Sequence, residues 1–203
     1  MCIRDSSYTK DFYLLNDQEY AVITRENITF YDEQLHPFEK KYQRIDWDAT
    51  AAEKNGYPDF MLKEMYEQPS TVRETIGTRV TAGAPTQVDG LDFTAAQLQN
   101  LHQIYIIGCG TAMHAGLAAK PMFEHLTHIP TQVDVASEFR YRDPLVDDRT
   151  LCIFISQSGE TADTIAALRL AKAAGAATLA VSNVIGSSIT READYTVYTH
   201  AGP

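Results

Sequence analysis

The stretch Leu151–Thr161, with the sequence LCIFISQSGET, decides how the rest of this chain is interpreted. It opens with five consecutive apolar residues, Leu151–Ile155, a run of strand length that is typical of a parallel strand buried on both faces of a sheet. We therefore expect a central strand. Apolar residues then return at helical spacing from Ala162 until Gly175, which predicts a helix that ends there.

Small polar residues lie at the junction between this strand and this helix. The first amides of a helix have no intrahelical partner and carry the positive end of the helix dipole, so such a junction attracts anions. Ser156, Ser158 and Thr161 add hydroxyl donors, and Gly159 lets the backbone approach a ligand. The pattern indicates a phosphate or sugar-phosphate site, and the alternative is an ordinary loop whose Ser and Thr only cap the helix.

A second junction of the same kind lies earlier in the chain. Residues 103–107 form a short apolar strand, Gly108-Cys109-Gly110-Thr111 predicts a tight turn, and a helical pattern runs from 112 to 126 with Pro121 inside it, where we expect a kink. If the two strands are neighbours, both turns face one pocket. Neither turn matches a Walker A loop or the GxGxxG dinucleotide turn, so nucleotide binding is disfavoured.

Composition narrows the class of protein. The 203 residues, 44% of them hydrophobic, suit one medium domain plus an appendage. A net charge of -10 argues against nucleic acid or an anionic membrane as a main partner. The 3 cysteines have no paired or metal-ligand spacing, there is no apolar run of the roughly 20 residues that a membrane helix needs, and no signal peptide is evident. We therefore expect a cytoplasmic protein without a metal or cofactor.

From His102 onward, in the carboxyl-terminal half of the chain, strands alternate with helices. Further strands are expected at 131–136, 177–182 and 194–199, and short helical turns at 137–142 and after Ser187. Strands that alternate with helices predict a parallel sheet with helices on both faces. The expected fold class is thus α/β, a three-layer sandwich around a five-stranded parallel sheet.

The amino-terminal half is organised differently. Residues 1–7 show no periodicity, and short strands are expected at 12–15, 20–24 and 28–31, the last two as a hairpin, with His36-Pro37 ending the segment. The remaining expectations are a linker over 46–58, a helix over 59–67 closed by Pro69, a second helix from Thr71 to about Val80, and a short helix over 94–101.

Five motifs carry a resemblance to a known family. They are FMLKEMYEQP at 60–69, GCGTAMHAG at 108–116, VASEFRYR at 135–142, SQSGETADT at 156–164 and GSSITREAD at 186–194. Together they resemble the sugar isomerase (SIS) domain, and more narrowly the isomerizing glutamine–fructose-6-phosphate aminotransferases, which make glucosamine 6-phosphate from fructose 6-phosphate and glutamine. Residues 8–48 resemble the carboxyl end of that family's glutaminase domain.

The resemblance implies a domain organisation and a set of site residues. Residues 8–48 would be a glutaminase-domain remnant, 49–68 a linker with a linker helix, and 69–203 a first SIS domain truncated at its carboxyl end. Ser156, Gln157, Ser158 and Thr161 would hold the phosphate of the sugar, and Cys109, Gly110 and Thr111 would line the sugar site. Ala112 stands where several members of the family have Ser, which removes one hydroxyl donor but leaves the backbone amide.

The resemblance also implies what this chain lacks. The glutaminase nucleophile and the second SIS domain, which carries the base and the lysine, lie outside it, so we expect no catalytic residue here and an internal fragment that does not catalyse alone. The implied partners are fructose 6-phosphate or glucosamine 6-phosphate, glutamine through the missing domain, and a second copy in a homodimer. The alternatives are a sugar-phosphate-sensing SIS module and a related sugar-phosphate isomerase or deglycase without a glutaminase.

The charged residues of the motifs have simpler interpretations. Glu138, Arg140 and Arg142 are expected to form a subunit or domain contact. Glu160 is expected near the pocket, where the start of the following helix already accounts for its charge.

Overall fold

A computed structural model describes residues 9–44, 54–77, 79–80, 88 and 90–202. The chain divides into two compact units, one comprising residues 1–63 with 203 and the other residues 64–202. Most of the expected linker over 46–58 lies outside the described residues. Among the described residues, no helix is both long enough and apolar enough to cross a membrane.

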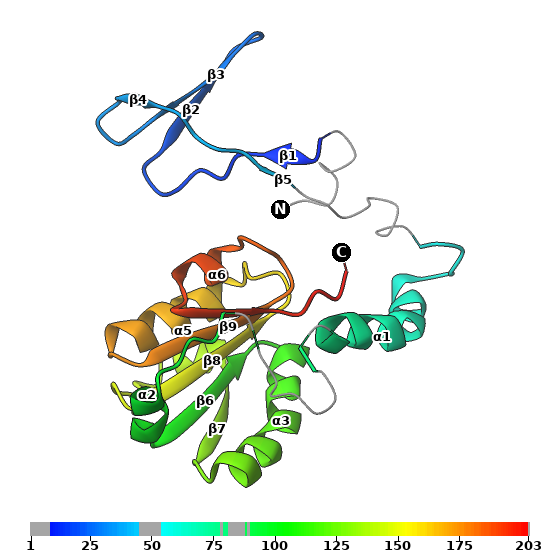
Figure 1. Cartoon of the computed structure of the whole chain (residues 1–203), viewed down its shortest axis with the longest axis vertical. Coiled ribbons are helices and arrows are strands. Elements are labelled where there is room, and N and C mark those ends of the chain that lie inside the picture. The colour runs from blue at the N-terminus through cyan, green and yellow to red at the C-terminus, as the bar shows by residue number, and fades with distance from the viewer. Residues whose placement is uncertain (1–8, 45–53, 78, 81–87, 89, 203) are drawn as a thin grey trace. The chain divides into compact units, whose positions relative to one another are not determined.

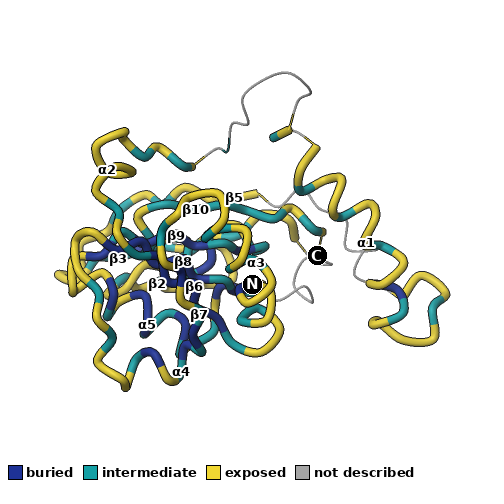
Figure 2. Tube along the Cα trace, turned by 90° about the horizontal axis from the view of Figure 1, so that it is seen from below, coloured by how far each residue is buried: buried dark blue, intermediate teal, exposed yellow. Residues whose placement is uncertain are grey.

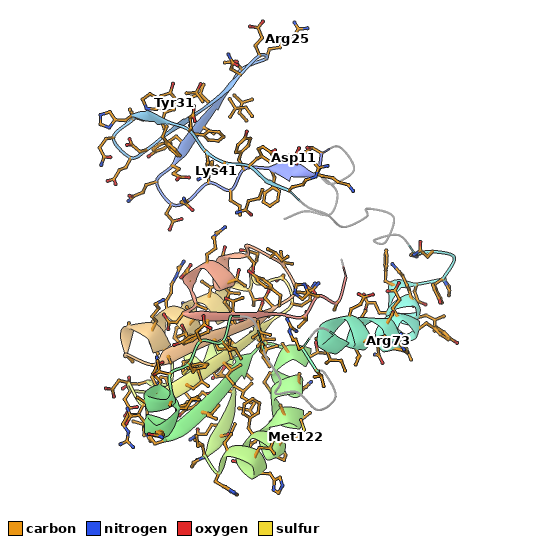
Figure 3. All side chains as sticks on the ribbon, viewed as in Figure 1. Asp11, Arg25, Tyr31, Lys41, Arg73 and Met122 are labelled. Carbon is orange, nitrogen blue, oxygen red and sulfur yellow. The ribbon has the colours of Figure 1, made fainter. Side chains whose placement is uncertain are left out.

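The described strands of the first unit are short and antiparallel (Figure 1). The hairpin of β2 and β3 is confirmed, with Tyr20 opposite Tyr31, and Arg25 lies at its tip (Figure 3). The expectation that His36-Pro37 ends the segment is wrong. Phe38 pairs with Phe30 in β4, because a proline is tolerated where its missing N–H is not needed for the ladder. The strands of this unit are β1 (Asp11–Phe12), β2 (Tyr20–Ile23), β3 (Ile28–Tyr31), β4 (Pro37–Phe38) and β5 (Gln43–Arg44).

A single helix, α1 (Phe60–Gly77), replaces the two helices expected from the sequence. It begins where the Asp59 carboxylate accepts the amide hydrogen of Leu62 at 2.8 Å, and it continues through Pro69. Thr71 does not start a helix, because its hydroxyl donates backward to the carbonyl of Gln68 at 3.1 Å instead of capping a new helix.

The second unit is built on a parallel sheet with the order β10-β9-β8-β6-β7, which confirms the five-stranded parallel sheet (Figure 1). β8 is the middle strand, as its apolar run predicts, and β7 is an edge strand. The strands are β6 (Gln103–Gly108), β7 (Thr131–Val135), β8 (Thr150–Ser156), β9 (Ala177–Ser182) and β10 (Tyr195–Tyr198). The helices are α2 (Ala95–Asn100), α3 (Thr111–Thr127), α4 (Ala136–Phe139), α5 (Ala162–Ala173) and α6 (Ser188–Glu192).

Alternate residues of the central strands feed two separate apolar cores, one on each face of the sheet. Tyr105 and Ile107 of β6 pack with α4, α5 and α6, whereas Ile104 and Ile106 pack with α3 and with apolar residues that flank α2. The buried residues of Figure 2 accordingly gather along β6, β8 and β9. The helices thus cover both faces of the sheet, which confirms the three-layer arrangement.

The outer side of β10 is covered by residues that precede β6. Gly90 approaches so closely that a Cβ atom there would lie 2.2 Å from the carbonyl oxygen of Thr196. The rings of Phe93 and Tyr195 have centroids 4.0 Å apart, and the side-chain amide of Gln97 donates to the Tyr195 hydroxyl at 3.0 Å. These contacts place the segment before β6 directly against β10.

Candidate phosphate-binding site

The two junctions singled out in the sequence lie side by side. β6 and β8 are paired, with Gly108 opposite Ile155 at their carboxyl ends. The chain leaves β6 through α3 toward β7 and leaves β8 through α5 toward β9, so the direction of the strand order reverses between these two strands. Open α/β sheets bind ligands at such a switch point. β6 and β8 are thus adjacent, as one shared site requires.

The turn after β6 presents the uncapped start of α3. Gly110 occupies the N-cap position with a φ of 57°, and no side chain caps the helix there. The first amide to find an intrahelical partner is that of His114, which donates to the Gly110 carbonyl at 3.2 Å. The amides of residues 111–113 are therefore the ones that a ligand at this helix start would meet. Thr111 is exposed beside them.

The loop after β8 presents a second uncapped helix start. Thr161 occupies the N-cap position of α5, and its side chain caps no amide of the helix. Ile165 is the first residue whose amide reaches back, donating to the Thr161 carbonyl at 3.0 Å. The Cys109 sulfur lies 3.8 Å from the Thr164 hydroxyl, which places the first turn of α5 against the turn after β6. Both helix starts thus border one region.

The hydroxyl groups of the β8–α5 loop, residues 157–161 with Ser156 before them, have different roles. The Ser156 side chain is buried, and its oxygen accepts the amide hydrogen of Gly159 at 3.1 Å and lies 3.3 Å from the Thr161 hydroxyl. Ser158 is partly exposed, and its oxygen accepts the amide hydrogen of Glu160 at 3.2 Å, which leaves its own proton available to an external acceptor. Gln157 is exposed. Ser156 therefore holds the loop in shape, while Ser158 and Gln157 face outward.

Gly159 fits the loop tightly against the start of α6. Its φ is 68°, and a Cβ atom on it would lie 2.0 Å from the Ser187 hydroxyl oxygen and 2.5 Å from the Ser187 Cβ. Its carbonyl accepts the amide hydrogen of Ile189 at 3.1 Å. Only glycine suits both the backbone conformation and the space at this position.

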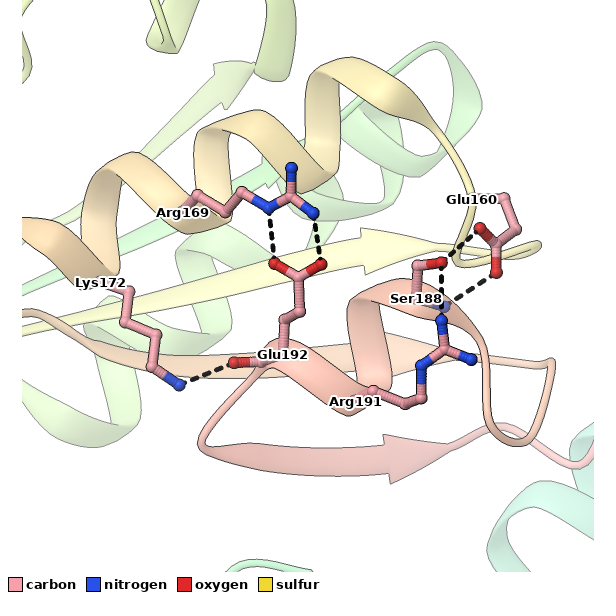
Figure 4. Close-up of polar contacts among 6 residues, drawn as sticks. All are labelled: Glu160, Arg169, Lys172, Ser188, Arg191 and Glu192. Atoms are coloured by element: carbon pink, nitrogen blue, oxygen red, sulfur yellow. Dashed lines mark hydrogen bonds and ion pairs between the residues drawn. The ribbon is translucent and has the colours of Figure 1, made fainter. Parts of the chain in front are cut away.

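Glu160 has a different role from the one expected. Its carboxylate accepts the Ser188 amide hydrogen at 2.8 Å and the Ser188 hydroxyl hydrogen at 2.7 Å (Figure 4). The Arg191 guanidinium donates to the same hydroxyl at 3.3 Å and to the Gly186 carbonyl at 3.1 Å. The charge of Glu160 is thus directed to α6 rather than to the start of α5. The sequence alone does not indicate this, because the order of β8 and β9 in the sheet decides which loop lies beside Glu160.

The charged motif at 138–142 also makes contacts within the chain. Arg140 pairs with Asp163, in the first turn of α5, at 2.8 Å, and Arg142 pairs with the buried Asp134 at the end of β7. These two arginines hold β7 and α5 together beside the switch point. Within the described residues, no group of three or more His, Cys, Asp or Glu side chains is placed to hold a metal ion.

The two described cysteines differ in their surroundings. Cys152 lies in the interior of β8, and burial raises the pKa of its thiol to about 12. Cys109 is partly exposed at the turn after β6. Cys152 is therefore a packing residue, whereas the position of Cys109 suits contact with a ligand.

These features define a three-layer α/β domain that presents two uncapped helix starts and several hydroxyl groups at its switch point. A family model described as SIS domain matches residues 97–203. The chain belongs to the SIS domain family.

Curated relatives match almost the whole chain. A glutamine–fructose-6-phosphate aminotransferase [isomerizing] of Clostridium acetobutylicum is 51% identical over 197 residues, 97% of this chain and 32% of the relative. The corresponding protein of Clostridium tetani is 48% identical with the same coverage. A solved structure, the C-terminal domain of glucosamine-fructose-6-phosphate aminotransferase from Francisella tularensis, superposes with a TM-score of 0.66 at 41% identity and covers 74% of this chain and 42% of that chain. The chain thus spans about a third of the length of these curated relatives.

Proposed function

We propose that this chain is the part of an isomerizing glutamine–fructose-6-phosphate aminotransferase that binds the phosphate of its sugar substrate. The carrying observation is the pair of uncapped helix starts of α3 and α5 at the ends of adjacent strands β6 and β8. Amides at helix starts bind phosphate groups, and hydroxyl donors beside them add charge-assisted hydrogen bonds. The relatives that carry this name support the choice of substrate.

The proposed contacts divide between two groups of residues. The amides at the start of α5, with Gln157, Ser158 and Thr161, would hold the phosphate, and Ser156 would contribute mainly by shaping their loop. The turn formed by Cys109, Gly110 and Thr111 would line the sugar. The amide of Ala112 would take part without a hydroxyl. No catalytic group is assigned to the chain, because a site made of amides and hydroxyls binds an anion but supplies no base.

The proposal includes the wider context of such an enzyme. Ammonia from glutamine would reach the sugar through a glutaminase domain, and a second SIS domain would complete the isomerase site. Residues 8–48 are proposed to belong to the glutaminase domain, 49–68 to a linker and 69–203 to the first SIS domain. We also propose a cytoplasmic homodimer for the complete enzyme.

The test is a calorimetric titration of the 203-residue chain with fructose 6-phosphate, fructose and inorganic phosphate. We expect fructose 6-phosphate to bind more tightly than inorganic phosphate, and fructose not to bind measurably. Ser158→Ala combined with Thr161→Val should weaken binding at least about tenfold, since hydrogen bonds to a charged group contribute roughly 1.5 to 3 kcal/mol each. Ser137→Ala, on the short helix α4, is the matched control and should bind as the unaltered chain does.

Two results would contradict the proposal. Equal affinity for fructose and fructose 6-phosphate would show that the chain does not recognise the phosphate group. Unchanged affinity of the double variant would show that the β8–α5 loop does not bind the sugar phosphate. A sensor module or a sugar-phosphate isomerase of the same family would share the phosphate site, and these are separated from the aminotransferase by assaying the complete protein for glutamine-dependent formation of glucosamine 6-phosphate.

A further inference from the structure

Asn183, the first residue after β9, contacts the β8–α5 loop through its backbone. Its amide donates to the carbonyl oxygen of Gln157 at 3.1 Å, and the Ser182 hydroxyl donates to the same oxygen at 3.4 Å. Gln157 is the residue at which the loop leaves β8. The conformation of the loop at that point is therefore held by the end of the neighbouring strand.

The side chain of Asn183 contacts a different segment, residues 199–202. Its carbonyl oxygen accepts the hydroxyl hydrogen of Thr199 at 2.8 Å and the amide hydrogen of Ala201 at 2.8 Å. Its amide nitrogen donates to the carbonyl of Gly202. These three bonds use the acceptor and a donor of one carboxamide, so neither Asp nor Ala can replace the set.

The segment 199–202 has few other attachments near this point. The amide of Thr199 donates to the Ser182 carbonyl at 3.0 Å, and its carbonyl accepts the Thr75 hydroxyl hydrogen from α1. For Ala201 and Gly202 the described residues provide only the bonds to Asn183. Among the described residues, Asn183 thus links the two segments, because its side chain binds Ala201 and Gly202 and its backbone amide binds Gln157.

We propose that Asn183 is a positioning residue that couples the β8–α5 loop to residues 199–202, so that a sugar phosphate bound at the loop orders this segment. The inference rests on the proposed function. Because linkage is reciprocal, ordering of the segment strengthens sugar-phosphate binding by the same factor. The role of Asn183 is indirect, since it acts through Gln157.

The test measures amide hydrogen exchange of the 203-residue chain by NMR, with and without saturating fructose 6-phosphate. Asn183→Ala and Thr199→Val are compared with the unaltered chain, and Asn100→Ala, at the exposed end of α2, is the matched control. In the unaltered chain and the control, the ligand should slow exchange in both 156–161 and 199–202. In Asn183→Ala, protection of 156–161 should persist while that of 199–202 is lost, and the affinity should fall roughly threefold to tenfold.

Hydrogen exchange measured without ligand tests the coupling independently of the proposed function. If fructose 6-phosphate does not bind the unaltered chain, the proposed function fails, and the coupling is then judged on the free proteins. There, Asn183→Ala should speed exchange of the Ala201 amide roughly tenfold and also speed exchange in 156–161. Thr199→Val, which removes only a hydroxyl, should show a smaller effect of the same kind and serves if Asn183→Ala does not fold. Ligand-induced protection of 199–202 that survives Asn183→Ala, or exchange at 156–161 that no variant alters, would overturn the proposal.

Discussion

Substitution of Gly159 by alanine tests how tightly the β8–α5 loop is fitted to α6. Two penalties act together at this residue. A φ of 68° costs an L residue roughly 1 to 2 kcal/mol relative to glycine. The new Cβ would also lie 2.0 Å from the Ser187 oxygen, and overpacking of a closely packed region costs about 1 to 3 kcal/mol. We expect the free energy of unfolding to fall by roughly 2 to 5 kcal/mol.

Gly110→Ala separates the two penalties. Gly110 also has a positive φ, 57°, and also precedes a helix, but no heavy atom lies within 4 Å of its ideal Cβ position. Its substitution should therefore cost only a conformational penalty, roughly 1 to 3 kcal/mol, because a φ of 57° with a ψ of -129° lies in a region that L residues rarely adopt. The variant Gly159→Ala with Ser187→Gly should recover part of the loss, because the atoms nearest the new methyl group are gone.

Urea unfolding followed by circular dichroism measures all three variants. The linear dependence of the free energy on denaturant gives each difference directly, provided that the slope is unchanged. If Gly159→Ala with Ser187→Gly is no more stable than Gly159→Ala alone, the close contact with Ser187 is not a constraint on the loop and the reasoning is refuted.

Two further predictions follow from the pKa values of side chains in the second unit. A hydrogen bond from Arg169 holds the pKa of Glu192 below its usual value (Figure 4). The pair therefore stabilises the folded state above the unfolded pKa of Glu192, which is about 4.3. This contribution is lost as the pH falls through the lower pKa of the folded state. The difference in unfolding free energy between the unaltered chain and Glu192→Gln, measured in urea at several pH values, should be about 0.5 kcal/mol at pH 7 and should shrink as the pH falls below about 4.3. A difference independent of pH would contradict this prediction. With a thiol reagent at pH 8, Cys109 should react while the chain is folded and Cys152 only after unfolding, because burial raises the pKa of the Cys152 thiol to about 12. Mass spectrometry of the modified peptides measures the labelling of each cysteine. Equal labelling of the two in the folded chain would contradict this prediction.

The strands of the second unit were predictable because their signal is local. The apolar run 151–155 and the run 103–107 belong to strands buried on both faces, and such strands need apolar residues at every position. The capping box of α2, in which Thr94 and Gln97 exchange hydrogen bonds, also follows from neighbouring residues. The order of the strands does not, because it depends on which side of β6 each crossover takes.

The failures have physical reasons as well. Pro69 lacks an amide hydrogen and was expected to end a helix, yet the helix continues through it and forgoes the one bond to the Met65 carbonyl. A tolerated proline and a terminating one look the same in sequence. The kink expected at Pro121 stays a prediction, although the helix α3 does continue through that residue.

The candidate site was likewise predictable only in part. Its residue types were visible in the sequence, but the different roles of Ser156 and Ser158 depend on which hydroxyl is buried against its own loop. The contribution of Asn183 depends on residues 157 and 199–202, which the fold brings to one place from separate parts of the chain. No local pattern reports such a contact.

The segment that crosses β10 has a consequence for the behaviour of the protein at high concentration. An uncovered outer strand can recruit a strand from another molecule and so begin aggregation. Here the backbone at Gly90 occupies the space beside Thr196, where a side chain would collide with the carbonyl oxygen. A bulky residue at position 90 would lift this cover and leave the molecule prone to stick to its own copies.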